Sequence, residues 1–131
     1  MPQRILVIDD DSSVRATIKL ILASQGFDVI GAGSGGAGLT LLRHAPFSFD
    51  LLICDVVMPG MDGVKTIKAV LAHKPTLPII AISGARLRLS GASPLEMFSL
   101  APGLATVKCL QKPFRPRELL AAVTSLLGIA A

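Results

Sequence analysis

Residues 5–11 read Ile5-Leu6-Val7-Ile8-Asp9-Asp10-Asp11. Four consecutive apolar residues that stop at a group of acids are typical of a short strand buried on both faces of a parallel sheet. The pattern recurs at residues 50–55, which read Asp50-Leu51-Leu52-Ile53-Cys54-Asp55. Two such strands predict an α/β fold in which acidic side chains gather at one edge of the sheet.

Strand-like and helix-like segments alternate along the chain. The expected strands are Arg4–Ile8, Phe27–Ala32, Asp50–Cys54, Leu77–Ile82 and Thr106–Leu110. Apolar residues at helical spacing follow each strand, with Ser12 as the expected N-cap of the first helix, while Pro116 opens the last helix and Gly128 closes it. Because crossovers between parallel strands are right-handed, this repeat predicts a doubly wound, five-stranded parallel sheet in one domain over residues 1–131.

Composition excludes several classes of protein. Half of the residues (51%) are hydrophobic and 17% are charged, which excludes intrinsic disorder. No apolar run approaches the roughly 20 residues of a membrane span, and the N-terminus lacks a signal-peptide layout, so we expect a cytoplasmic protein without membrane contact. The cations are dispersed and aromatic residues make up only 4%, which argues against direct nucleic-acid binding. Cys54 and Cys109 lie in apolar runs without a CxxC spacing, so we expect buried, reduced thiols.

Polar residues stand at the ends of four expected strands, where α/β sheets bind ligands. They are Asp9, Asp10, Asp55, Ser83 and Lys112. The strand order 2-1-3-4-5 would bring the three carboxylates together, and their repulsion would then require a cation, for which Mg²⁺ is suited. Ser83 and Lys112 could contact phosphate oxygens. Asp55 ends a central strand and is therefore the best-placed nucleophile to form an aspartyl phosphate.

These motifs resemble the receiver domain of two-component response regulators. The matching stretches follow the family order and are residues 5–11, Leu51–Gly63 including Met58-Pro59-Gly60-Met61-Asp62-Gly63, Pro78–Gly84, and Lys112-Pro113-Phe114. The resemblance implies a flavodoxin-like (β/α)5 fold with strand order 2-1-3-4-5. It also implies a signalling phosphoacceptor rather than an enzyme. Such a domain catalyses only its own phosphorylation and its own slow dephosphorylation. The phosphoryl donor would be a histidine kinase or a histidine phosphotransfer domain, and the downstream partner another protein. The chain could also form a homodimer.

The resemblance also implies a role for individual residues. Asp55 would accept the phosphoryl group, and Mg²⁺ (or Mn²⁺) would be held by Asp10, Asp55 and the backbone carbonyl of Val57, with Asp9 in the outer shell. The phosphoryl contacts would be Ser83, Gly84 and Lys112, with a cis peptide bond between Lys112 and Pro113.

Three features depart from the family pattern. Cys109 occupies the position, three residues before Lys112, where the family usually has a switching aromatic residue; we expect a small buried thiol there. The segment between Ser83 and Lys112 is longer than usual, with the excess near residues 85–92, and is either a tolerated insertion or part of a partner-binding face. No output module follows the last helix, so if the chain is complete we expect its output to be a protein contact.

Three rival functions remain as alternatives. A pseudo-receiver that binds partners without phosphorylation is favoured by Cys109 and disfavoured by the intact acids. Residues 31–36, Gly31-Ala32-Gly33-Ser34-Gly35-Gly36, match the GxGxxG of dinucleotide-binding proteins, but we interpret them as a flexible strand-to-helix turn. An aspartate-nucleophile phosphatase would need an acid two residues after Asp55, where this chain has Val57.

Overall fold

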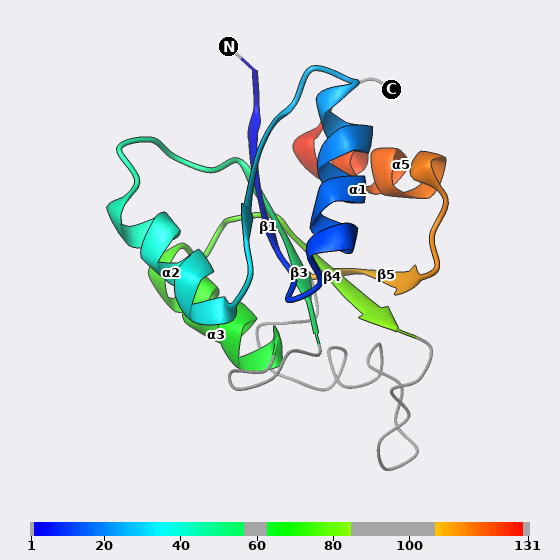
Figure 1. Cartoon of the computed structure of the whole chain (residues 1–131). Coiled ribbons are helices and arrows are strands. Elements are labelled where there is room, and N and C mark those ends of the chain that lie inside the picture. Colours follow the sequence, from blue (N-terminus) through cyan, green and yellow to red (C-terminus); the bar gives the residue numbers. More distant parts are fainter. Residues whose placement is uncertain (1, 57–62, 85–106, 130–131) are drawn as a thin grey trace.

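The computed structural model describes residues 2–56, 63–84 and 107–129 (Figure 1). The strands are β1 (Arg4–Ile8), β2 (Asp28–Ala32), β3 (Leu51–Asp55), β4 (Ile79–Gly84) and β5 (Lys108–Lys112). The helices are α1 (Ser12–Ala23), α2 (Gly35–His44), α3 (Gly63–His73) and α5 (Pro116–Leu127).

The five strands form one parallel sheet in the order β2-β1-β3-β4-β5. Helices α1 and α5 cover one face of the sheet, and α2 and α3 cover the other (Figure 1). The predicted doubly wound fold and its strand order are therefore confirmed. In this order β1 lies between β2 and β3, so the acids that follow β1 and those that end β3 meet at the same edge.

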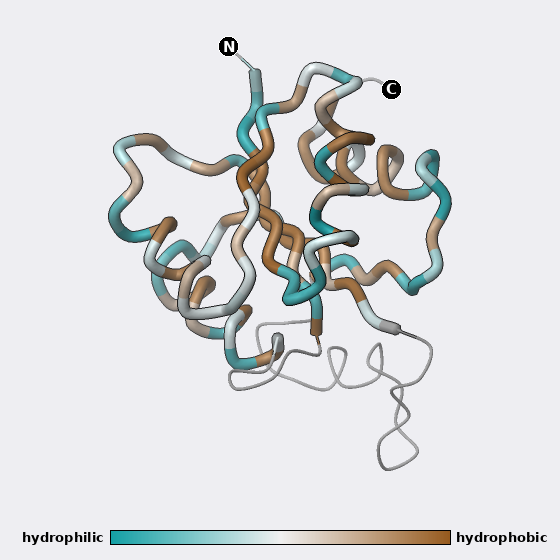
Figure 2. Tube along the Cα trace, viewed as in Figure 1, coloured by the Kyte–Doolittle hydropathy of each residue, from teal (hydrophilic) through white to brown (hydrophobic). Residues whose placement is uncertain are grey.

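The core consists of two apolar layers, one on each side of the sheet. Every residue of β3 is buried, and its side chains alternate between the layers: Leu51 and Ile53 pack toward α1 and α5, whereas Leu52 and Cys54 pack toward α2 and α3. In Figure 2 the hydrophobic colouring accordingly concentrates in the central strands. A strand buried on both faces fixes the place of Asp55 at its end.

Some expected boundaries differ from the structure. Strand β5 runs from Lys108 to Lys112, so it ends on the lysine rather than before it. The N-cap of α1 is Asp11 rather than Ser12, because the Asp11 carboxylate accepts the main-chain N–H of Ser13. The long segment at residues 85–92 lies outside the described residues.

The described helices are all too short, or not apolar enough, to cross a lipid bilayer.

Candidate functional site

Three carboxylates converge at the carboxyl ends of β1 and β3. Ile8 pairs with Cys54 in the sheet, so Asp9 and Asp55 continue neighbouring strands. The oxygens that Asp9, Asp10 and Asp55 offer all lie within 4.8 Å of one another. Asp9 and Asp55 are buried, with 1% and 5% of their surface exposed, whereas Asp10 is exposed. The sequence therefore predicted the convergence of the acids correctly.

Lys112 brings a positive charge to this acidic cluster from the end of β5. Its Nζ lies 3.1 Å from Oδ2 of Asp9 and 3.7 Å from Oδ2 of Asp55. The Lys112–Pro113 peptide bond is cis, as the resemblance implied. One ammonium against three carboxylates leaves an excess of negative charge on hard oxygen donors. This donor set fits a divalent cation such as Mg²⁺.

Asp9 is held at every polar atom. Its main-chain N–H donates to the carbonyl of Ala32 (3.1 Å), and its own carbonyl accepts Nη1 of Arg15 (2.6 Å). Its carboxylate accepts the main-chain N–H of Asp11 at Oδ1 (2.9 Å) and Lys112 at Oδ2 (3.1 Å). With both carboxylate oxygens engaged, Asp9 is better suited to orient the cluster than to give up a lone pair to a cation.

Asp11 serves helix α1 rather than the cluster. Its carboxylate accepts both the hydroxyl (2.6 Å) and the main-chain N–H (2.9 Å) of Ser13. The Ser13 hydroxyl, followed by the Ser13 amide, lowers the pKa of Asp11 below its ordinary 3.8. The negative charge therefore stays at the helix N-terminus, where the helix dipole favours it.

Helix α3 begins directly against the end of β3. The N–H of Gly63 donates to the carbonyl of Val56 (2.8 Å). A Cβ on Gly63 would overlap the main-chain oxygen of Asp55 and the main chain of Val56. Only glycine fits this close approach, which explains the last residue of the stretch from Leu51 to Gly63.

Ser83 and Gly84 end β4, the strand beside β3. Ser83 is 5% exposed and pairs with Gln111, and Gly84 pairs with Lys112. Since Asp55 pairs with Ile82, the serine lies one residue beyond the level of the phosphoacceptor candidate. The predicted switch residues thus end strands on the same side of the cluster, while Val57 lies outside the described residues.

The two cysteines are free thiols. Cys54 is buried in β3 and donates its thiol to the main-chain oxygen of Asp55 (3.3 Å). Cys109 is half-buried in β5, beside Ala81. Burial raises the pKa of both thiols, which keeps them protonated and slow to react. The expectation of buried reduced thiols is met fully at Cys54 and partly at Cys109.

The glycine-rich segment has a packing role that the sequence did not suggest. Gly31 lies in β2 and Gly33 follows the strand, and a Cβ on either would stand 3.3–3.4 Å from the nearest side-chain atom of Arg15. The space that these glycines leave is therefore filled by Arg15 rather than being part of a flexible turn. Arg15 was missed because no motif marks it. The available signal was two glycines at a spacing of two, which places them on one face of a strand.

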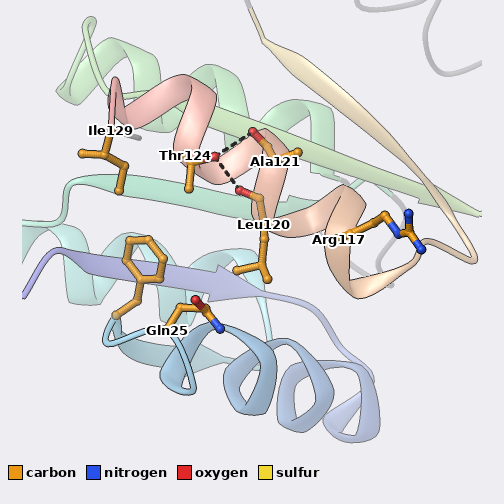
Figure 3. Close-up of a pocket in the computed structure, with 7 residues that line it drawn as sticks. Gln25, Arg117, Leu120, Ala121, Thr124 and Ile129 are labelled. Atoms are coloured by element: carbon orange, nitrogen blue, oxygen red, sulfur yellow. Dashed lines mark hydrogen bonds between the residues drawn. The ribbon is translucent and has the colours of Figure 1, made fainter. Parts of the chain in front are cut away.

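A separate pocket of about 390 Å³ lies between the end of α1 and α5 (Figure 3). Its lining is Gln25, Phe27, Arg117, Leu120, Ala121, Thr124 and Ile129. The Thr124 hydroxyl donates to the carbonyls of Leu120 and Ala121 in its own helix. The lining holds no carboxylate, histidine or thiol, and among the described residues the group of acids that could hold a metal ion is the aspartate cluster.

Comparison with known proteins gives consistent matches. The family model described as "Response regulator receiver domain" matches residues 5–124. The transcriptional regulatory protein CpxR of Escherichia coli is 36% identical over 124 residues, 95% of this chain and 49% of that protein. The DNA-binding response regulator MtrA of Mycolicibacterium paratuberculosis is 32% identical over 127 residues, 97% of this chain and 52% of that protein.

A solved receiver domain from Clostridium thermocellum superposes with a TM-score of 0.83 at 27% identity, covering 96% of this chain and 94% of that one. The chain spans about half the length of the curated relatives named above.

Proposed function

Because the chain belongs to the family of response regulator receiver domains of two-component systems, we propose that Asp55 is its phosphoacceptor. The observation that carries this assignment is the placement of Asp55 at the end of the central buried strand, 3.7 Å from the Lys112 ammonium and within the acidic cluster. A carboxylate oxygen of Asp55 attacks phosphorus, and the bond from phosphorus to the imidazole nitrogen of the donor breaks. The nitrogen keeps the electron pair.

The donor is a phosphohistidine on a histidine kinase or a histidine phosphotransfer domain. Mg²⁺, held by Asp10, Asp55 and the carbonyl of Val57 with Asp9 in the outer shell, would offset negative charge on the phosphoryl oxygens. The engagement of both Asp9 oxygens supports this division of roles. Mn²⁺ has the same preference for oxygen ligands and could replace Mg²⁺.

After transfer, we propose that Lys112, Ser83 and Gly84 contact the phosphoryl group and stabilise the product. Lys112 is already beside Asp55, and Ser83 is buried on the neighbouring strand. These contacts would shift a two-state equilibrium of the face formed by β4 and β5, which then binds another protein. Cys109 replaces the usual aromatic residue on this face, so the switch would rely on the serine.

The downstream partner is proposed to be a protein rather than nucleic acid. The names of the relatives call MtrA DNA-binding and CpxR a transcriptional regulator, but those names describe whole proteins, about half of which this chain matches. A phosphorylation-independent interaction module is the alternative function.

The test is the intact mass after incubation with acetyl phosphate and Mg²⁺. We expect wild type to gain one phosphoryl group only when Mg²⁺ is present, and Asp55→Asn to gain none. Asp50→Asn is the matched control, because Asp50 is exposed and precedes the same strand that Asp55 ends. A wild-type chain that gains no phosphoryl group, and also fails to bind beryllofluoride, would favour the phosphorylation-independent module.

A further inference from the structure

Arg15 makes a contact that its place in α1 does not require. It lies one turn into the helix, and its side chain turns away from the helix to cross the end of β2. Its Nη1 donates to the main-chain oxygen of Asp9 at 2.6 Å, a short hydrogen bond from a charged donor. A guanidinium that donates a hydrogen bond to a main-chain carbonyl restrains the orientation of the peptide plane to which that carbonyl belongs.

The peptide plane in question is the one between Asp9 and Asp10. Asp9 is already held by its N–H and by both carboxylate oxygens. Asp10 is exposed, so the neighbouring protein surface does less to restrain it. The Arg15 bond therefore acts at the point where the rigid Asp9 connects to the exposed Asp10.

Two glycines leave the space through which Arg15 reaches this point. A Cβ on Gly31 would stand 3.3 Å from Cδ of Arg15, and a Cβ on Gly33 would stand 3.4 Å from Nη1. The contact at Gly31 would be tight and would press on the aliphatic part of Arg15, whereas the contact at Gly33 would be an ordinary van der Waals contact with the guanidinium. Gly36, in the same glycine-rich segment, differs, because its Cβ would meet nothing within 4 Å.

We propose that Arg15 is a positioning residue, which holds the Asp9–Asp10 peptide so that the Asp10 carboxylate is preset to bind a divalent cation. Gly31 and Gly33 line the path of its side chain. The inference rests on the proposed Mg²⁺ site, and it adds a device, built from α1 and β2, that acts on the site through the main chain.

A purely electrostatic role of Arg15 would change the Mg²⁺ affinity in the opposite direction to a positioning role, so the two can be distinguished by experiment. A positive charge near the cluster competes with Mg²⁺, so a purely electrostatic role means that Arg15→Gln tightens Mg²⁺ binding. A positioning role means that Arg15→Gln weakens it, by about tenfold if it resembles other residues that orient metal ligands. Arg15→Lys keeps the positive charge and the ability to donate a hydrogen bond, and should recover part of the affinity.

The experiment is isothermal titration of the unphosphorylated protein with Mg²⁺, using wild type, Arg15→Gln, Arg15→Lys, Gly31→Ala and the double variant Arg15→Gln/Gly31→Ala, with Gly36→Ala as the control. Gly31→Ala should weaken binding in the wild-type background, because its Cβ would stand in tight contact with Cδ of Arg15. It should have almost no effect in the Arg15→Gln background, because the guanidinium hydrogen bond that it disturbs is then absent. Gly36→Ala should match wild type. Unchanged or tighter binding in Arg15→Gln, or equal effects of Gly31→Ala in both backgrounds, would overturn the proposal.

A readout without metal separates positioning from general loss of structure. The Asp11 N–H donates to Oδ1 of Asp9, so its exchange with solvent reports the order of this turn. In EDTA we expect faster exchange at Asp11 in Arg15→Gln and in Gly31→Ala, with the exchange of β3 amides unchanged.

Asp10→Asn distinguishes this inference from the function on which it rests. If wild type binds Mg²⁺ and Asp10→Asn does not, the site stands and the Arg15 variants alone decide the inference. If wild type binds no Mg²⁺, the proposed site and this inference both fail.

Discussion

Replacing Asp55 by asparagine should stabilise the metal-free protein, although it removes the proposed phosphoacceptor. The oxygens of Asp9, Asp10 and Asp55 lie within 4.8 Å of one another. Two charges at that distance repel by roughly 3.5 kcal/mol at an effective dielectric constant of about 20, and by roughly 1 kcal/mol in water. The first figure applies to buried Asp9 and the second to exposed Asp10. Neutralising Asp55 thus relieves about 4.5 kcal/mol of repulsion.

The substitution also removes an attraction. Lys112 Nζ lies 3.7 Å from Asp55 Oδ2, which corresponds to roughly 4.5 kcal/mol at the same dielectric constant. The lysine side chain is 27% exposed and keeps Asp9 as a partner at 3.1 Å, so we count about half of that attraction as lost. The balance favours asparagine by about 2 kcal/mol. For a domain of 131 residues this raises the melting temperature by about 7 °C.

Thermal unfolding followed by circular dichroism, in EDTA and in Mg²⁺, measures this effect. Mg²⁺ at a hundredfold excess over its Kd should stabilise wild type by about 2.7 kcal/mol and the variant by less, which closes or reverses the gap. Asp28→Asn is the control, since it removes an exposed carboxylate at the opposite end of the sheet and should respond to Mg²⁺ as wild type does. A lower melting temperature for Asp55→Asn than for wild type in EDTA would refute the electrostatic reasoning.

Three further outcomes are expected. Gly63→Ala should lower the free energy of unfolding, measured in urea, by about 1–3 kcal/mol, because its Cβ would overlap the main chain at the end of β3. Gly36→Ala is the control and should not lower it, because its Cβ would meet nothing within 4 Å. Equal stabilities of the two variants would contradict this packing. The raised pKa of each thiol predicts slow reaction of Cys54 and Cys109 with a disulfide reagent until urea is added, with half-buried Cys109 the faster; immediate reaction of both would show that they are accessible. Asp11→Ala should lower the melting temperature at neutral pH. Because the pKa of Asp11 is lowered in the folded state, this difference should shrink as pH falls below 3.8, and a difference independent of pH would argue against the capping bond.

The sequence was sufficient for the fold because its central strands, β1, β3 and β4, are apolar on both faces. Residues 51–54 are buried without exception, and a strand with two buried faces needs helices on both sides, which leads directly to the doubly wound sheet. The gathering of Asp9, Asp10, Asp55 and Lys112 followed from the same step, because parallel strands bring their carboxyl ends to one edge.

Details that depend on side-chain paths were not predictable in this way. Ser12 and Asp11 are both suitable N-caps, and the choice depends on where the chain leaves β1, which composition does not specify. Arg15 reaches Asp9 by crossing a strand from another part of the chain. Periodicity places Arg15 on a helix but contains no information about which main-chain carbonyl its guanidinium will meet.

Asp9 and Asp10 are neighbours at the same edge of the sheet, but they differ in burial and in the role that we propose for each. Asp9 continues β1 and is 1% exposed, so its charge requires partners, and the structure supplies Lys112 and the Asp11 amide. Asp10 is the first residue to leave the sheet and is exposed, so its charge stays hydrated and its oxygens can exchange water for a cation. In the proposed site the buried acid orients the cluster and the exposed acid binds Mg²⁺, because a carboxylate whose two oxygens are both engaged in internal pairs has less affinity left for a cation. The peptide bond between the two acids connects the restrained Asp9 to the proposed metal ligand Asp10, and the carbonyl of that peptide is the one that accepts the hydrogen bond from Arg15.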